Sequence, residues 1–136
     1  MGSSQLIVLD THAWLWWLSN PEHLSKKADE AVAAAMAENI LYLSAISAWE
    51  IAMLVKRGRL ELTMEVTDWI AKSEALPFLH FVPVSNGIAS KSVYLPGFFH
   101  DDPVDRIITA TALTMGAALV TKDEKMRKYP YVDTIW

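Results

Sequence analysis

Five short apolar runs, separated by stretches with helical spacing, constrain the fold of this chain more than any other feature. The runs are residues 5–9 (QLIVL), 40–44 (ILYLS), 80–84 (HFVPV), 117–121 (AALVT) and 131–136 (YVDTIW). Most of them are continuously apolar rather than alternating, which indicates strands that are buried on both faces. Such strands form parallel sheets with helices on each side, and Pro83 places its strand at an edge or a strand end.

Helices are expected between these runs. Ser25 and Asp102 are favourable N-caps, Pro103 suits a first helical position, and Gly58 and Gly116 end the helices that precede them. The expected helical segments are 11–18, 25–39, 45–56, 63–76, a short one after Ser85, 103–116 and 122–129. The alternation predicts an α/β fold of three α/β/α layers with a mostly parallel central sheet. We expect residues 1–136 to form a single domain, since a chain of this length can bury one substantial core.

Composition excludes several classes of protein. There is no cysteine, so disulfides and thiolate metal sites are absent from the chain. No apolar run approaches the roughly 20 residues of a transmembrane helix, and Met1–Ser4 carries no positive charge ahead of the first run, unlike a signal peptide. We therefore expect a cytoplasmic protein without membrane contact. A formal net charge of -4 argues against a broad basic surface for nucleic acid, although bound divalent metal would make a carboxylate site locally cationic.

Four carboxylates are placed so that the predicted sheet would bring them to one edge. Asp10 directly follows the first strand, Asp123 follows the fourth, Glu50 lies in the helix after the second, and Asp105 lies in the first turn of the Pro103 helix. Ligands of parallel sheets collect at the carboxyl ends of the strands. Clustered carboxylates repel one another and need a counter-ion, and their hard oxygens suit Mg2+, with Mn2+ as a substitute. Such a site can hydrolyse a phosphodiester bond.

Each of these acids also has a structural interpretation. Asp10 and Asp123 could cap the helices that follow them, and Asp102 is most simply the N-cap of its helix. Asp105 would then sit at the third helical position, where the helix dipole favours an acid. Between residues 45 and 55 only Ser47 and Glu50 are polar, so this helix is expected to be buried almost all round, with Glu50 in need of a partner. The alternative is a narrow exposed stripe.

Other candidate sites are weaker. The four histidines lack the spacing of a zinc site. Trp14, Trp17 and Leu18 share a helical face that belongs to a core more often than to a base-stacking platform. The basic cluster at 56–59 (Lys56, Arg57 and Arg59) is either solvated helix-end charge or a contact for a phosphate backbone. The common nucleotide-binding and hydrolase glycine motifs do not occur.

Five segments in this order resemble the PIN-domain family, and in particular the VapC-type toxins of toxin–antitoxin modules. The segments are LIVLDTHAWLWWL, LSAISAWEIAMLVKRGRLEL, HDDPVDRIITATAL, ALVTKDEKM and VDTIW. The resemblance implies that Asp10, Glu50, Asp105 and Asp123 are the catalytic, metal-binding acids. It also implies magnesium-dependent cleavage of RNA, a homodimer, and a cognate antitoxin whose C-terminal segment enters the acidic groove. Asp101 and Asp102 lie nearby and leave the exact ligand set open.

The many large apolar side chains are consistent with partner surfaces, although a richly packed monomer would also need them. Trp16 points away from the Trp14 face, and Val66, Trp69 and Ile70 form one stripe that is a candidate interface. Two other classes of function remain as alternatives. A phospho-acceptor receiver domain has a similar acidic α/β chain but needs paired acids where Asp10 stands alone. A non-catalytic binding protein on the same fold is the other.

Overall fold

The sheet seen in the computed structural model, which describes residues 5–136, is entirely parallel. The expectation drawn from Met1–Ser4 lies outside the described residues. The strands lie in the order β3-β2-β1-β4-β5. Their bounds are β1 Ile7–Leu9, β2 Leu41–Ser44, β3 Leu79–Val82, β4 Ala118–Val120 and β5 Thr134–Ile135. As the Pro83 argument predicted, β3 is an edge strand, and β1 lies at the centre beside β4.

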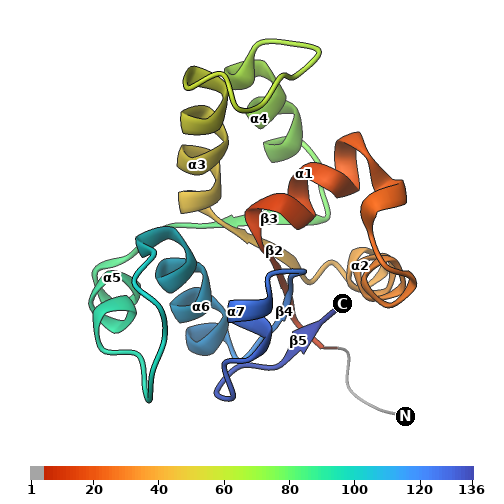
Figure 1. The fold of residues 1–136 in the computed structure, drawn as a ribbon. Helices are drawn as coiled ribbons and strands as arrows, with labels where there is room; N and C mark the ends of the chain where they lie inside the picture. Colours follow the sequence, from red (N-terminus) through yellow and green to blue (C-terminus); the bar gives the residue numbers. More distant parts are fainter. Residues whose placement is uncertain (1–4) are drawn as a thin grey trace.

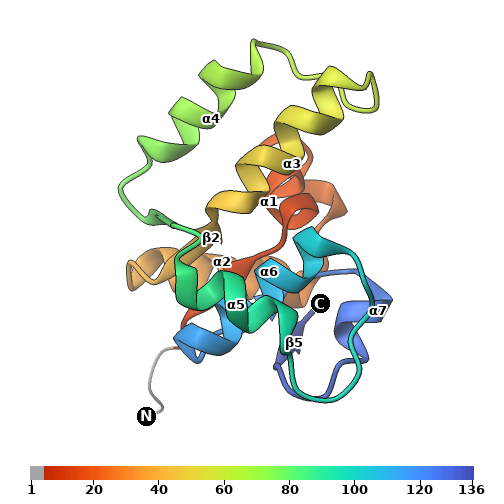
Figure 2. The same ribbon diagram turned by 90° about the vertical axis from the view of Figure 1, so that its left-hand side faces the viewer.

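Seven α-helices and one 3-10 turn (Pro21–His23) connect these strands within the described residues. The helices are α1 Thr11–Ser19, α2 Lys26–Ala37, α3 Ala45–Lys56, α4 Val66–Glu74, α5 Asn86–Val93, α6 Pro103–Met115 and α7 Glu124–Arg127. Figures 1 and 2 show α3 and α4 projecting together beyond the sheet, while α5, α6 and α7 gather on the other side of the molecule from α2. Over residues 5–136, no helix combines the length and apolar character needed to span a membrane.

Two hydrophobic cores, one on each face of the sheet, establish the three-layer α/β/α architecture. Side chains of β1 alternate between them: Ile7 and Leu9 join the core formed with α1, α2 and α4, whereas Val8 joins the core formed with α5, α6 and α7. Trp14 and Ile108 are among the largest buried side chains of the two cores. The predicted fold class is therefore confirmed, and the apolar runs are strands because both of their faces are covered.

The strand order separates this fold from that of a receiver domain. Receiver domains follow the order 2-1-3-4-5, whereas here the second strand separates β1 from β3. The single acid after β1 had already made that alternative weak, and the topology removes it.

Two predicted boundaries were wrong. The helix expected from Thr63 begins at Val66, because Leu60, Leu62 and Met64 pack against the first core and the chain bends at residues 63 and 64 before the helix starts. The strand expected over residues 131–136 is limited to Thr134–Ile135, since Val132 turns into the second core instead.

Two predictions about exposure were also wrong. Helix α3 is not buried all round: it projects beyond the sheet, only Ser47 and Ile51 of its residues are buried, and Trp49 is 53% exposed. The stripe formed by Val66, Trp69 and Ile70 is not a free interface, because it packs against the chain's own first core.

Of the face formed by Trp14, Trp17 and Leu18, Trp14 is fully buried, Trp17 packs at the edge of the core, and Leu18 is 38% exposed.

The contrast between Trp14 and Trp49 yields a stability prediction. The Trp14 ring is 0% exposed, its centroid lies 4.7 Å from that of Trp69, and its Nε1 donates a hydrogen bond to Ser73 Oγ at 3.2 Å. Trp14→Ala should lower the free energy of unfolding by about 3–5 kcal/mol, because a large cavity opens in the core. Trp49→Ala should lower it by less than about 1 kcal/mol. Urea denaturation measures both, and equal losses would contradict this description of the core.

Candidate active site

The four acids singled out by the sequence line a single cavity of about 570 Å³. Asp10 follows β1, Asp123 follows β4, Glu50 comes from α3 and Asp105 from the first turn of α6. Because β1 and β4 are parallel neighbours, their carboxyl ends lie side by side, and this places the first two acids next to each other. Asp102 lines the same cavity, so the acidic corner contains one more carboxylate than the four expected.

Asp10 is held in place by two hydrogen bonds. One of its carboxylate oxygens accepts from the backbone N–H of Ala13 at 2.7 Å, and the other accepts from the Thr121 hydroxyl. The residue is 7% exposed, and this burial raises the pKa of its carboxyl above the usual range, although the two hydrogen bonds oppose the shift. Both interpretations of Asp10 therefore describe one side chain, which caps α1 and also lines the cavity.

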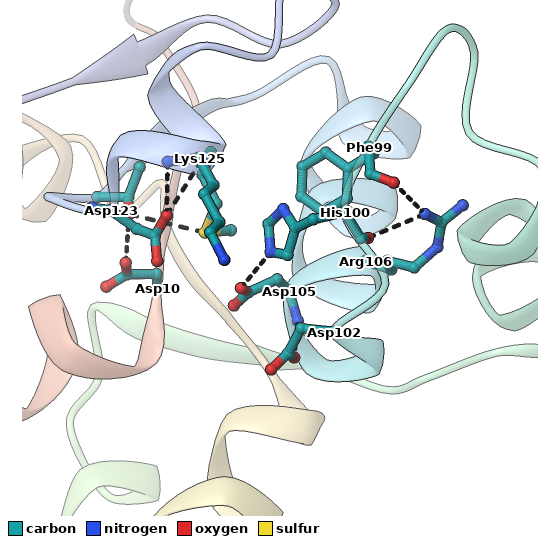
Figure 3. Close-up of polar contacts among 10 residues, drawn as sticks. Asp10, Phe99, His100, Asp102, Asp105, Arg106, Asp123 and Lys125 are labelled. Carbon is teal, nitrogen blue, oxygen red and sulfur yellow. Dashed lines mark hydrogen bonds and ion pairs between the residues drawn. The ribbon is translucent and has the colours of Figure 1, made fainter.

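Thr121 is a site residue that the sequence analysis did not single out. Its fully buried hydroxyl donates to Asp10 and accepts from the backbone N–H of Asp123 at 3.1 Å, so it bridges the two acids. Asp123 in turn caps α7 by accepting from the N–H groups of Lys125 and Met126 (Figure 3). The signal in the sequence was the T-x-D spacing at the end of β4, which places a hydroxyl two residues before the acid.

Asp105 faces this pair from α6 and is held by His100, a second residue that the sequence analysis missed. His100 Nε2 lies 2.7 Å from Asp105 Oδ2 (Figure 3). Burial raises the pKa of Asp105 to about 6; the His100 hydrogen bond lowers it, and the neighbouring charges of Asp102 and Asp123 raise it. Asp102 caps α6 by accepting from the Asp105 N–H at 3.0 Å, as its sequence position predicted.

The segment that carries His100 is fixed by Arg106. The guanidinium donates to four backbone carbonyls, those of Ser92, Val93, Phe99 and His100, at 2.8–3.1 Å. Figure 3 shows the bonds to Phe99 and His100. A five-donor planar group suits this role because several carbonyls can be satisfied at once. The H-D-D-P-V-D-R motif thus contains both the acid and the residues that position it.

Glu50 reaches the cavity from α3. One turn earlier, the buried Ser47 accepts a hydrogen bond from the Thr11 hydroxyl at 2.9 Å, which ties α3 to the start of α1. Glu50 also lines a second, more apolar cavity of about 400 Å³ together with Trp49, Arg57 and Arg59. Two members of the basic cluster at 56–59 therefore lie near the acids, whereas Lys56 is exposed and lines neither cavity.

The donor set fits a hard divalent cation by its chemistry. All five carboxylates that line the cavity offer oxygen ligands, and burial disfavours the charged forms of Asp10 and Asp105, which a bound cation would favour. In the conformation described for residues 5–136, no three acidic or imidazole groups are close enough together to hold one ion. Carboxylates from the two sides of the cavity would have to close on the ion by side-chain rotation.

With this geometry established, comparison with known proteins decides the family. The model of the PIN domain matches residues 7–131. The chain belongs to the PIN-domain family. This PIN domain is of the VapC type: it is 35% identical over 132 residues to Ribonuclease VapC22 of Mycobacterium tuberculosis, a match that covers 96% of this chain and 98% of the relative.

Solved structures share the fold of this PIN domain at low sequence identity. VapBC2 from Rickettsia felis, solved with a fragment of promoter DNA, aligns with a TM-score of 0.69 at 15% identity, over 94% of this chain and 96% of that chain. A toxin–antitoxin complex from Klebsiella pneumoniae aligns with a TM-score of 0.61 at 22% identity, over 93% and 94%. FitAcB from Neisseria gonorrhoeae gives 0.61 at 21% identity, over 94% and 95%. The resemblance stated from the sequence is confirmed.

The raised pKa of Asp105 predicts how the metal-free protein responds to pH. The folded protein keeps a proton on Asp105 up to a pH of about 6, whereas the unfolded chain releases it near the ordinary pKa of 3.8. The stability that this proton provides is present at low pH and is lost as the pH rises through 6. At pH 7 the free energy of unfolding of Asp105→Asn should therefore exceed that of the wild type, by up to about 2–3 kcal/mol.

Below pH 4 this difference between the two proteins should vanish. Denaturant unfolding in the presence of a chelator, repeated from pH 4 to pH 8, measures it. A variant that is less stable than the wild type at pH 7 would show that the Asp105 charge is already compensated by its neighbours.

Proposed function

We propose that this PIN domain is a magnesium-dependent endoribonuclease that acts as the toxin of a toxin–antitoxin pair. The observation that carries the proposal is the convergence of Asp10, Glu50, Asp105 and Asp123, from four separate segments, on one cavity at the carboxyl edge of the sheet. Membership of the VapC type supports RNA as the substrate, because the relative from Mycobacterium tuberculosis is named a ribonuclease. Manganese is expected to substitute for magnesium.

In this proposal the acids form the metal site and their neighbours keep them in position. Magnesium, when bound, supplies the Lewis acidity that activates water and stabilises the leaving oxygen of a phosphodiester. Asp10 and Asp123 are the acids that the Thr121 hydroxyl links at the ends of β1 and β4. Asp105 is oriented by His100. Glu50 completes the set from α3, beside a cavity through which substrate can reach the acids.

The requirement for the acids and for metal can be tested together. Purified wild type should cleave total RNA in magnesium and not in a chelator. Asp123→Asn should reduce the rate by at least about 100-fold, since even the loss of outer-shell partners of a metal site commonly reduces activity by 10–100-fold. Asp133→Asn is the matched control, because that exposed acid lines none of the described cavities that contain the four acids.

The binding of metal to the folded protein gives a second measurement. Magnesium should raise the melting temperature of the wild type more than that of Asp123→Asn, because a ligand of the native state stabilises it. If metal stabilises the protein and no RNA is cleaved, the chain is a binding protein on this fold, which was the non-catalytic alternative.

A protein partner is the second part of the proposal. The solved structures that share this fold include toxin–antitoxin complexes, and the cavity beside Glu50 is lined largely by apolar side chains, including Trp49, Met53 and Ile107. A bound antitoxin would cover this surface and reach the acids. We also propose a homodimer, which the VapC resemblance implies; Tyr94 and Phe98, which are 83% and 89% exposed, offer apolar surface for contact between chains.

Expression in bacteria tests the partner and the assembly. The chain alone should arrest growth, and co-expression of the small reading frame next to its gene should restore it. Light scattering should show twice the chain mass at micromolar concentration. A harmless chain that binds no such product would contradict the toxin assignment even if RNA cleavage is real, and a species of single-chain mass at every concentration would contradict the dimer.

A further inference from the structure

One end of the acidic cavity is aromatic and cationic. Trp16 and His12 of α1 and Lys122 of the loop after β4 line the same 570 Å³ cavity as the carboxylates. The Lys122 ammonium lies 5.8 Å from the centroid of the Trp16 ring. The four acids and the residues that orient them do not account for this combination of a ring and a positive charge.

The Trp16 ring is held by other rings while remaining only partly buried. It stacks with His23 at a centroid distance of 5.6 Å and an interplanar angle of 25°, and tilted contacts with His12 and Trp136 lie at 5.8 Å. A ring fixed in this way loses little conformational freedom when a ligand contacts it. Most tryptophans that are packed by neighbours merely fill a core, but this one also faces the cavity that contains the acids.

Lys122 has no competing partner among residues 5–136: no carboxylate there forms an ion pair with its side chain, which is exposed. An ammonium attracts an anionic ligand, whereas the carboxylates of the same cavity repel one unless a bound cation offsets their charge. Because the net charge of the chain is -4, a polyanion must be attracted by local cations such as this one. The ammonium lies over the Trp16 ring, and a nucleotide that draws this exposed side chain onto its phosphate would open the ring to stacking by its base.

We infer that Trp16 and Lys122 form a binding subsite for one nucleotide of single-stranded RNA next to the bond that is cleaved. Lys122 pairs with a phosphate, and Trp16 stacks with the base of the same nucleotide. The inference rests on the proposed ribonuclease function and adds to it two residues that would hold the substrate, and only an unpaired base can leave its stack to meet the ring. The face of α1 that the sequence analysis weighed as a platform, with Trp14 and Trp17, is a different one.

Binding of a labelled single-stranded oligoribonucleotide tests the subsite. Affinity is measured by fluorescence anisotropy in magnesium, with every protein carrying Asp123→Asn to prevent cleavage. Trp16→Ala should weaken binding by about tenfold or more, the loss expected for one base stack, and Trp16→Phe should restore most of it. Tyr131→Ala, which removes an exposed aromatic side chain that lines neither this cavity nor the one beside Glu50, should leave affinity unchanged.

Salt dependence tests the contact with phosphate. Lys122→Gln should reduce the slope of log affinity against log salt by about 0.7, the value for one phosphate contact on a single strand. Lys128→Gln makes the same change of charge at an exposed position outside the cavity and should leave the slope unaltered. In the active protein, Trp16→Ala should raise KM and leave kcat nearly unchanged, because base stacking is lost equally from the ground state and the transition state.

The outcomes separate the subsite from the proposed function. If the wild type cleaves RNA and both Trp16→Ala and Lys122→Gln bind it normally, the subsite is wrong and the ribonuclease stands. If the wild type neither cleaves nor binds RNA, both are wrong. Should Trp16→Ala fail to fold, judged by its melting curve, Lys122→Gln decides the matter alone, because it alters an exposed side chain.

Discussion

The buried carboxylate of Asp10 and the hydroxyl of Thr121 meet where the two central strands of the sheet end. The hydroxyl donates to Asp10 and accepts from the backbone of Asp123, so one side chain sets the relation between two acids that are 113 residues apart in sequence (123 − 10 = 113). The pairing of Leu9 with Val120 provides this alignment. A shift of one residue in that register would turn Thr121 to the other face and separate the acids, so the site depends on the two cores that fix the register.

Two of the acids lie where burial disfavours their charged form. Burial raises the pKa of Asp10 and of Asp105, and the charges of other carboxylates add to the effect at both positions. Hydrogen bonds from Thr121 and His100 reduce the penalty without removing it. Buried carboxylates of this kind destabilise the folded protein when they are charged, and natural proteins accept such local conflict mainly where function requires it. The fold supplies the compensating stability through apolar side chains such as Trp14 of α1, which is fully buried.

The sequence was sufficient to predict the architecture and to predict that the four acids lie at one edge of the sheet, because both follow from local patterns. Continuous apolar runs indicate strands covered on both faces, and an acid just beyond such a strand must lie at the sheet's carboxyl edge. Exposure was harder to predict: α3 is as apolar as a buried helix, yet it projects beyond the sheet and leaves Trp49 open. Val66, Trp69 and Ile70 looked like an interface because the core that they join, including the Trp14 ring that meets Trp69, is remote in sequence.

Among the residues that support the acids, only Thr121 had a signal in the sequence, its T-x-D spacing, and the others could not be predicted for a related reason. Thr121, His100 and Arg106 belong to types that occur throughout protein surfaces and cores, and what distinguishes them is the neighbour that each one meets. Arg106 resembled an ordinary helical charge until its four carbonyl partners were visible. Such contacts join separate segments, and no periodicity along the chain encodes them.

Three of the acids at this site, Asp10, Asp102 and Asp123, are also helix caps. A descendant that lost its chemistry would still need a side chain able to accept backbone hydrogen bonds at those positions, and asparagine meets that need about as well as aspartate. Evolutionary drift would therefore preserve Asp or Asn there long after selection for catalysis had ended. Glu50 caps nothing and sits in the middle of α3. If the proposed nuclease site is correct, its retention among relatives of this chain would be the better sign that a lineage has remained an enzyme.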